Sequence, residues 1–420
     1  MKDDLCRTID RYKEDLLKLN EELFRHPELG FKEFKTRELL KTFLRDHDLP
    51  EGEDCALSGF TLSLGGGYPH IGIIAELDAI PTRGHPFADP ETTAAHACGH
   101  STQQVIALGA LLALKEEELP GKVTLFFTPA EEFTDLDYRK ELRSKGKIKY
   151  LSGKQNMLEE GIFDDCDCLI HFHAMGASDY RFSVGSVLSG FVHKKITFHG
   201  KAAHAAVLPH MGINALHEFT LFLSGVNMLR ETFREEDVVR LHGIVTDGGN
   251  TVNSIPDKVV YECYVRSVNA EALQKISAEV DRMAEHCAAA FGGSCEIEET
   301  PGYLPLHQSP ELNEVVEANI LSFANPSEIL HGEISPAAGD VGDVCMFKPV
   351  VQYGYNGFSG RIHGADLCIS DPLEACITPA KITAAIVYDL LHDPAKVKQI
   401  REAWPVRMTK EEYRRYLSGE

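Results

Sequence analysis

The sequence predicts an α/β protein in which a large domain, with a mixed sheet and helices on both faces, is interrupted by a smaller α+β domain. Over residues 1–188, short apolar runs alternate with helical patterns, which is typical of a sheet covered on both faces. Over 189–303, strands of alternating polarity and amphipathic helices replace this pattern. The first pattern returns over 304–420. We therefore expect two domains, of which the larger is split in the sequence.

The elements of the large domain follow from periodicity and from turn residues. Apolar residues spaced by three and four predict a helix over 5–23, which ends at the turn 26–30. A second helix is expected over 34–44, and Ser101 is expected to cap a buried helix over 105–114. Short apolar runs predict buried strands at 60–64, 71–77, 123–127 and 168–172.

The smaller domain shows the order strand, helix, strand, strand, helix, strand. The ranges are 191–199, 216–229, 238–245, 259–268, 271–291 and 294–298. This is the element order of a ferredoxin-like unit. A strand over 350–355 and a closing helix over 379–391 then complete the large domain.

The composition indicates a globular protein of the cytoplasm. A length of 420 residues predicts two or three domains at roughly 150 residues each. The formal net charge of −22 argues against nucleic acid or an anionic membrane as a partner, because both attract a cationic surface. No apolar run approaches the ~18 residues of a membrane-spanning helix, and no signal peptide is visible. The 11 scattered cysteines are expected to be reduced thiols, because their number is odd and no disulfide framework is visible.

The sharpest local signal is the motif His96-Ala97-Cys98-Gly99-His100. Alternate side chains of an extended segment lie on one side, so His96, Cys98 and His100 can converge on a metal ion. The helix expected after His100 favours the thiolate of Cys98, which is the form that binds metal. The alternative is a buried structural cysteine flanked by hydrogen-bonded histidines.

Two adjacent carboxylates, Glu131 and Glu132, follow the strand over 123–127. Sites in open α/β sheets lie beyond the carboxyl ends of strands, so this position suits function. One carboxylate can bind a metal while the other acts as a general base. The alternative is a solvated acidic loop.

Cysteines and histidines alternate over 166–173, on opposite faces of the expected strand. Cys166 and Cys168 share a face with apolar residues, so we interpret them as buried small side chains. His171 and His173 share the other face, where one or both can bind metal.

Further residues are weak signals when taken singly. His204 follows the first strand of the smaller domain, among residues too small to need it for packing. Asn253, Arg266 and His363 are equally weak, the last lying in a glycine-rich loop. The stretch 139–154 carries seven basic residues. We interpret that stretch as a solvated face, with a loop that faces the substrate as the alternative.

Taken together, these residues resemble the di-metal peptidase and amidohydrolase family that includes hippurate hydrolase, auxin-conjugate hydrolases, aminoacylase and carboxypeptidase G. The resemblance runs in order through nearly the whole chain. Its motifs are RHPELGF (25–31), ELDAIP (76–81), HACGH (96–100), PAEE (129–132), HFH (171–173), GKAAHA (200–205), NSIPD (253–257), Arg266, GDVGDV (339–344) and His363. The chain departs from many relatives at Glu76, at Ser101 and in the polar insertion 135–160.

The resemblance implies two divalent metal ions per subunit, zinc or manganese, in a catalytic domain. The implied ligands are Cys98, His100, Glu132, His173 and His363. His173 is preferred to His171 because it keeps the family's spacing from Asp167. Glu131 would be the general base, and Asp78 would orient the metal site.

The same resemblance implies that the smaller domain is a lid and dimerisation domain of a homodimer. His204 would reach an active site across the dimer interface and stabilise an oxyanion. Asn253 and Arg266 would bind a carboxylate of the substrate, for which the planar guanidinium of arginine is well suited.

The sequence therefore predicts a metal-dependent hydrolase, of the aminoacylase and carboxypeptidase type, that cleaves the amide bond of an N-acyl or N-aryl amino acid or short peptide. Metal-activated water would attack, with Glu131 as base. One alternative is a catalytically inactive metal- or ligand-binding relative, which would have no use for Glu131 beside Glu132. Another is a TIM-barrel amidohydrolase, suggested by His171 and His173. That class needs the histidine pair on its first strand, whereas here about 170 residues precede it.

Overall fold

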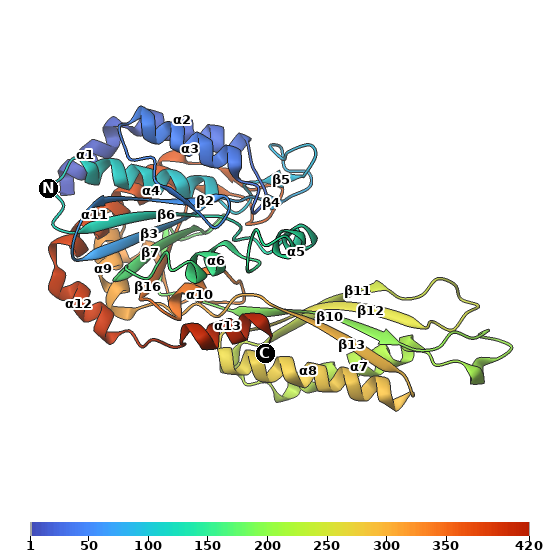
Figure 1. Cartoon of the computed structure of the whole chain (residues 1–420). Coiled ribbons are helices and arrows are strands. Elements are labelled where there is room, and N and C mark those ends of the chain that lie inside the picture. The colour runs from blue at the N-terminus through green and yellow to red at the C-terminus, as the bar shows by residue number, and fades with distance from the viewer. Residues whose placement is uncertain (1, 420) are drawn as a thin grey trace. The chain divides into compact units, whose positions relative to one another are not determined.

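The computed structural model describes residues 2–419, which divide into two compact units (Figure 1). The first unit comprises 2–187, 307–333 and 343–407. The second comprises 188–306, 334–342 and 408–419. The second unit thus includes two short late segments that the sequence analysis assigns to the large domain.

Both late segments join the second unit through pairing or packing. β15 (Ile334–Ser335) pairs with β9 (Val187–Leu188), and α13 (Lys410–Ser418) packs against β13 (Ser294–Pro301). Contacts of this kind link segments far apart in the sequence, so the sequence pattern alone gives no sign of them.

The first unit is built on an eight-stranded mixed sheet in the order β1-β2-β6-β3-β7-β16-β8-β14. In that order the strands are Glu53–Cys55, Gly59–Gly65, Lys122–Thr128, His70–Glu76, Cys168–Ala174, Val350–Tyr355, Phe182–Val184 and Ile329–His331. Strands β6, β3, β7 and β16 are parallel, whereas β2 and β8 run antiparallel to their neighbours β6 and β16. The predicted mixed α/β class is confirmed. An open mixed sheet excludes the TIM-barrel alternative, which needs a closed parallel barrel.

Side chains cover both faces of this sheet. The helices α4 (His100–Lys115) and α11 (Thr378–His392) pack on one face, in a core that includes Leu125 and Phe127 of β6. Phe126 points to the opposite face, because neighbouring residues of a strand alternate. There its ring lies 4.8 Å from the ring of Phe163, measured between centroids.

The other helices and short strand pairs surround this sheet. The helices are α1 (Lys2–Arg11), α2 (Lys13–Arg25), α3 (Phe34–Asp46), α5 (Leu136–Ser144), α6 (Gly153–Glu159), α9 (Pro310–Ile320), α10 (Val341–Cys345) and α12 (Pro394–Ala403). The pairs are β4 (Ile80–Pro81) with β5 (Ala94–Ala95), and β17 (Phe358–Ser359) with β18 (Cys368–Ile369).

The second unit holds a four-stranded antiparallel sheet in the order β11-β12-β10-β13. The strands and helices that precede β13 are, in chain order, β10 (Gly190–His199), α7 (Ala215–Leu229), β11 (Arg240–Asp247), β12 (Lys258–Ser267) and α8 (Ala270–Ala290). Alternate residues of β10, such as Ile196 and Phe198, form one core with both helices. Together with β13, these elements follow the order of a ferredoxin-like unit.

Two expected helices differ in detail from the structure. The helix expected over 5–23 is two helices, α1 and α2, which are separated at Tyr12. Helix α4 begins directly after Gly99, whose φ of 84° is left-handed and suits glycine. Ser101, expected to be the cap, instead lies inside the helix and is buried. Among the described helices, none has the length and apolar character needed to cross a bilayer.

Candidate active site

The candidate site lies at the carboxyl ends of parallel strands in the first unit. β3 ends at Glu76, with Asp78 two residues further on. Glu131 and Glu132 follow the end of β6, and His173 lies next to the last residue of β7. Loops that follow neighbouring parallel strands meet at one edge of a sheet, so these side chains converge although they are far apart in the sequence.

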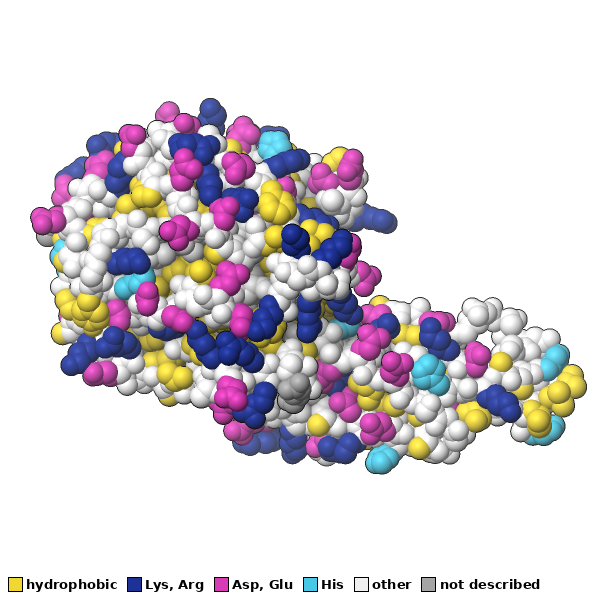
Figure 2. Space-filling model, in the orientation of Figure 1, with side chains coloured by type: hydrophobic (Ala, Val, Ile, Leu, Met, Phe, Trp, Pro, Cys, Tyr) yellow, Lys and Arg dark blue, Asp and Glu magenta, His cyan; other side chains and the backbone are white. Residues whose placement is uncertain are grey.

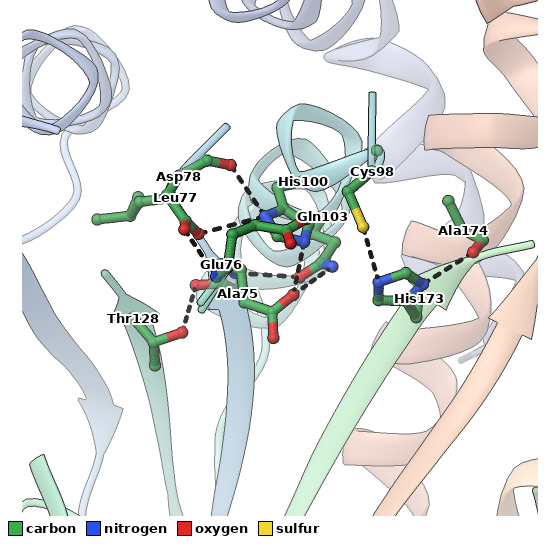
Figure 3. Close-up of polar contacts among 12 residues, drawn as sticks. Ala75, Glu76, Leu77, Asp78, Cys98, His100, Gln103, Thr128, His173 and Ala174 are labelled. Atoms are coloured by element: carbon green, nitrogen blue, oxygen red, sulfur yellow. Dashed lines mark hydrogen bonds and ion pairs between the residues drawn. The ribbon is translucent and has the colours of Figure 1, made fainter. Parts of the chain in front are cut away.

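Cys98 and His100 reach this edge from the turn before α4. The Sγ atom of Cys98 lies 3.4 Å from Nε2 of His173 (Figure 3). Nδ1 of His100 lies 2.9 Å from the backbone oxygen of Asp78 and 3.3 Å from its Oδ1. A histidine that donates from one ring nitrogen to such a partner presents the other nitrogen to a metal. Asp78 thus orients the ring of His100.

Glu132 and His363 form the other half of the site. Oε1 of Glu132 lies 3.1 Å from Nε2 of His363. The amide of Glu132 donates to Oδ2 of Asp78 at 2.9 Å, and the amide of His363 donates to the carbonyl of Ala97 at 2.7 Å. His363 has a left-handed backbone, with φ of 62°. A conformation that is costly for a residue with a side chain persists where its surroundings fix it, as at functional sites.

The donor atoms at this edge fit divalent metal ions. Three groups among the described residues have donor atoms within 4.8 Å of one another: Cys98, His100 and His173; Cys98, Glu132 and His363; and Glu76, His100 and Glu131. The first two groups contain every ligand that the family resemblance implies. Thiolate, imidazole and carboxylate are the donors that zinc prefers, and imidazole and carboxylate also suit manganese.

The pKa values agree with a site prepared for cations. Burial and Glu132 raise the pKa of the Cys98 thiol. The imidazoles of His173 and His100 have the larger effect and lower this pKa to about 6. Cys98 is therefore largely a thiolate at neutral pH. Burial lowers the pKa of His363, but its hydrogen bonds to Cys98 and Glu132 raise it to about 11. A bound metal ion would replace the proton that this ring carries.

His96 and His171 lie outside the two groups that share Cys98. Nε2 of His171 is 3.2 Å from Oε1 of Glu76, and its Nδ1 is 3.0 Å from Oε1 of Gln352. His96 is buried, and its ring nitrogens make no hydrogen bond among the described residues. Because burial lowers the pKa of His96 to about 3, its ring is neutral. The HACGH motif therefore contributes two of its three candidate donors.

Glu76 is the centre of a buried polar cluster that the sequence analysis missed. Its Oε1 pairs with Nζ of Lys154 at 2.7 Å. Its Oε2 accepts a hydrogen bond from Gln103 at 2.8 Å and lies 3.1 Å from Nε2 of His100 (Figure 3). Lys154 and Glu76 are 78 positions apart, so no local pattern could have indicated the pair.

Lys154 and Arg139 are the last and the first of the basic residues in 139–154, and both are fully buried. For these two residues the interpretation as a solvated face is wrong. Lys154 pairs with Glu76, and Arg139 donates hydrogen bonds to backbone carbonyls of the first unit. The intervening Lys140, Arg143 and Lys145 are exposed, as that interpretation expects.

A second buried carboxylate, Glu33, was also missed. It accepts hydrogen bonds from the hydroxyl of Ser58 at 2.6 Å and from the amide of Ala130 at 2.7 Å. These hydrogen bonds lower the pKa of Glu33, but burial and the nearby Asp78 have the larger effect and raise it to about 7. Its position just after the RHPELGF motif was the available signal.

The remaining predicted residues lie in the second unit. Nε2 of His204 is 3.3 Å from Nδ2 of Asn253, so the two side chains are neighbours. Arg266 is carried by β12, and its guanidinium carbon lies 5.3 Å from the ring centroids of Phe191 and Tyr264. Aromatic faces of this kind hold a guanidinium by cation–π attraction.

Residues 72–389 match the model of a family described as peptidase family M20/M25/M40. An N-acetyldiaminopimelate deacetylase of Leuconostoc mesenteroides is 29% identical over an alignment of 398 residues, which covers 87% of this chain and 94% of the relative. An N-acetyl-L-cysteine deacetylase of Bacillus subtilis is 27% identical over an alignment of 309 residues, which covers 70% of this chain and 69% of the relative. Among solved structures, a dinuclear metal-binding peptidase of family M20 from Bacillus subtilis has a TM-score of 0.71 at 21% identity, covering 91% of this chain and 99% of that one.

Proposed function

Because the chain belongs to peptidase family M20/M25/M40, we propose that it cleaves the amide bond of an N-acyl or N-aryl amino acid or short peptide. The proposed general base is Glu131. The observation that carries this proposal is the placement of Glu131. It follows the end of β6 beside Glu132, and a donor oxygen of Glu131 lies within 4.8 Å of donors on Glu76 and His100. Because the five proposed ligands are other residues, Glu131 is left to take and give a proton.

The proposed ligands of two divalent ions are Cys98, His100, Glu132, His173 and His363. Zinc or manganese suits this mixed donor set. When bound, such ions polarise a carbonyl group and acidify water. Glu132 and Cys98 bring negative charge to the site, which balances part of the charge of two cations.

Glu131 would move the proton. A carboxylate within hydrogen-bond reach of the attacking water takes its proton, and the resulting acid protonates the leaving amine as the C–N bond breaks. One carboxyl group can perform both transfers because the water attacks the carbonyl carbon next to the leaving nitrogen.

The two deacetylase relatives support an N-acetyl amino acid as the substrate class, because they are named for the deacetylation of N-acetyl-L-cysteine and N-acetyldiaminopimelate. Arg266 and Asn253 are proposed to bind the carboxylate of that substrate. The guanidinium carbon of Arg266 lies 5.3 Å from the centroids of two aromatic rings, which attract the cation. The planar fork of a guanidinium can bind both carboxylate oxygens.

The proposed homodimer would place His204 at the active site of the partner subunit, where it would stabilise the oxyanion. The second unit has surfaces that suit such an interface. β11 is an edge strand on which Ile244 and Val245 are exposed, and unpaired strand edges favour association. Figure 2 shows apolar and histidine side chains at the end of this unit, and its loops expose Val207, Met211 and Val252.

A hydrolysis assay on a panel of N-acyl amino acids tests the reaction. The purified chain is incubated with zinc or with manganese, and release of the free amine is measured against a metal-free control. Turnover of N-acetyl amino acids that requires the metal is expected. Inactivity on every substrate with every metal would support the alternative, a binding protein without catalysis.

Mixing two inactive variants tests the role of His204 across the dimer. H204A lacks the oxyanion donor and E131Q lacks the base, so each alone should be nearly inactive. A mixed dimer has one site with both groups intact, and refolding an equal mixture should restore up to about a quarter of the activity. No restoration, or full activity in a monomer seen by sedimentation, would refute the shared site.

A further inference from the structure

The insertion 135–160 packs directly against the loop that carries Glu131 and Glu132. The guanidinium of Arg139, from helix α5, is fully buried. Its Nη2 donates to the carbonyl of Glu132, and its Nη1 donates to the carbonyls of Ala130 at 3.3 Å and Leu151 at 2.7 Å. One side chain thus binds the backbone on both sides of Glu131.

The loop needs such support because Ala130 has a left-handed backbone, with φ of 53°. This conformation is unfavourable for a residue with a side chain and persists only where the surroundings fix it. The amide of Ala130 donates to the buried Glu33 at 2.7 Å, while its carbonyl accepts from Arg139. A buried carboxyl group and a buried guanidinium therefore hold the two polar groups of this one residue.

Two glycines allow neighbouring segments to approach Arg139 and the loop 129–132 closely. A side-chain carbon at Gly30 would lie 2.3 Å from Nη2 of Arg139. A side-chain carbon at Gly153 would lie 1.7 Å from the carbonyl oxygen of Pro129. Both positions require glycine for close approach, and both bring the insertion and the RHPELGF motif against the same loop.

We propose that Arg139 is a positioning residue that fixes the backbone of Ala130–Glu132 and so aims Glu131 and Glu132 into the metal site. This rests on the proposed function for its effect on turnover, although its effect on the metal site is independent of any substrate. On this proposal the insertion 135–160 positions the loop that carries Glu131 and Glu132. Arg139 would act through the peptide groups of the loop, since its hydrogen bonds to Ala130, Glu132 and Leu151 are all made to backbone carbonyls.

The test compares three variants of the full chain. R139M replaces the guanidinium by an apolar side chain of similar length. R139K keeps a buried cation but loses the fork that reaches the three carbonyls. R143M is the matched control, because Arg143 lies one turn further along α5 and is exposed.

Each variant is loaded with cobalt, and the absorption of the bound cobalt is recorded together with kcat and KM on an N-acetyl amino acid. R139M should alter the cobalt spectrum and lower kcat by about 10²-fold, because a small displacement of a catalytic group has an effect of that size. KM should change little. R139K should be intermediate, and R143M should match the unchanged chain.

A wild-type cobalt spectrum and kcat in R139M would overturn the proposal, even if the variant melts at a lower temperature, because Arg139 would then serve stability alone. If R139M does not fold, R139K decides by the same measurements. If the unchanged chain turns over no substrate, the proposed function fails while the cobalt spectrum still tests Arg139.

Discussion

The Sγ atom of Cys98 lies 3.4 Å from Nε2 of His173, although the two residues are 75 positions apart in the chain. The thiol is buried, and the imidazoles of His173 and His100 overcome the effect of burial and lower its pKa to about 6. A thiolate held beside imidazoles is the arrangement that a metal ion of borderline softness prefers. Cys98 is the one residue common to the two donor groups that contain the proposed ligands, so its loss would affect both groups.

Replacing Cys98 by serine should therefore weaken metal binding more than it weakens the fold. The cobalt-loaded chain should show a thiolate-to-cobalt charge-transfer band, and C98S should lack it. C368S is the matched control, since Cys368 is exposed. A band that survives in C98S would show that another group holds the metal.

E131Q should leave the metal content nearly unchanged and lower kcat by roughly 10²-fold or more, because the amide cannot accept the proton of the attacking water. Metal content by elemental analysis and steady-state kinetics measure the two effects separately. Undiminished turnover would remove Glu131 from the proposed role, and loss of metal would assign it to binding.

K154M should destabilise the metal-free protein by about 3–5 kcal/mol, because it leaves the buried carboxylate of Glu76 without its cation. Urea unfolding in the presence of a chelator measures this. The double variant K154M/E76Q removes both charges and should recover much of the loss. Lys149 pairs with Glu159 at the surface of the same segment, so K149M should cost no more than about 1 kcal/mol. Equal losses for K154M and K149M would contradict the buried pair.

The second unit should lose stability between about pH 5 and pH 7 through Glu218. Both carboxylate oxygens of this residue are buried without a hydrogen bond among the described residues, and burial raises the pKa of Glu218 to about 7. Because the folded state keeps the proton that the unfolded chain releases above pH 4.5, stability falls as pH rises through this range and is level above it.

E218Q should remove that part of the pH dependence. Its melting temperature relative to the unchanged chain should be higher at pH 8 than at pH 5. E231Q, which changes an exposed carboxylate of the same unit, should show no such difference. An E218Q profile parallel to that of the unchanged chain would assign the pH dependence elsewhere.

The central strands and the parity of β7 could be predicted from the sequence. The apolar runs at 71–77 and 123–127 correspond to β3 (His70–Glu76) and β6 (Lys122–Thr128). In β7, Cys168 and Phe172 belong to the main core, whereas His173 turns to the site. Local patterns were sufficient here because strand periodicity decides which face a side chain takes.

The contacts of Arg139, Lys154 and Glu33 could not be predicted in this way. Each is a buried charge whose partners come from other parts of the chain, such as Lys154 with Glu76. A basic residue in a polar segment looks the same in the sequence whether it is solvated or buried, since long-range pairing alone distinguishes the two. The sequence of the polar insertion therefore did not indicate which of its charged residues are buried.

The split of the first unit has a consequence for the order in which the site is made on the ribosome. β16 (Val350–Tyr355) completes the centre of the eight-stranded sheet, and His363 supplies the last proposed ligand, yet both follow the second unit in the chain. Domains generally fold in the order in which they are synthesised. The second unit can therefore be largely formed while the first still lacks a sheet strand and a ligand. Binding of metal by all of the proposed ligands would have to wait until His363 has been synthesised, and a chain truncated before this residue would carry an incomplete site.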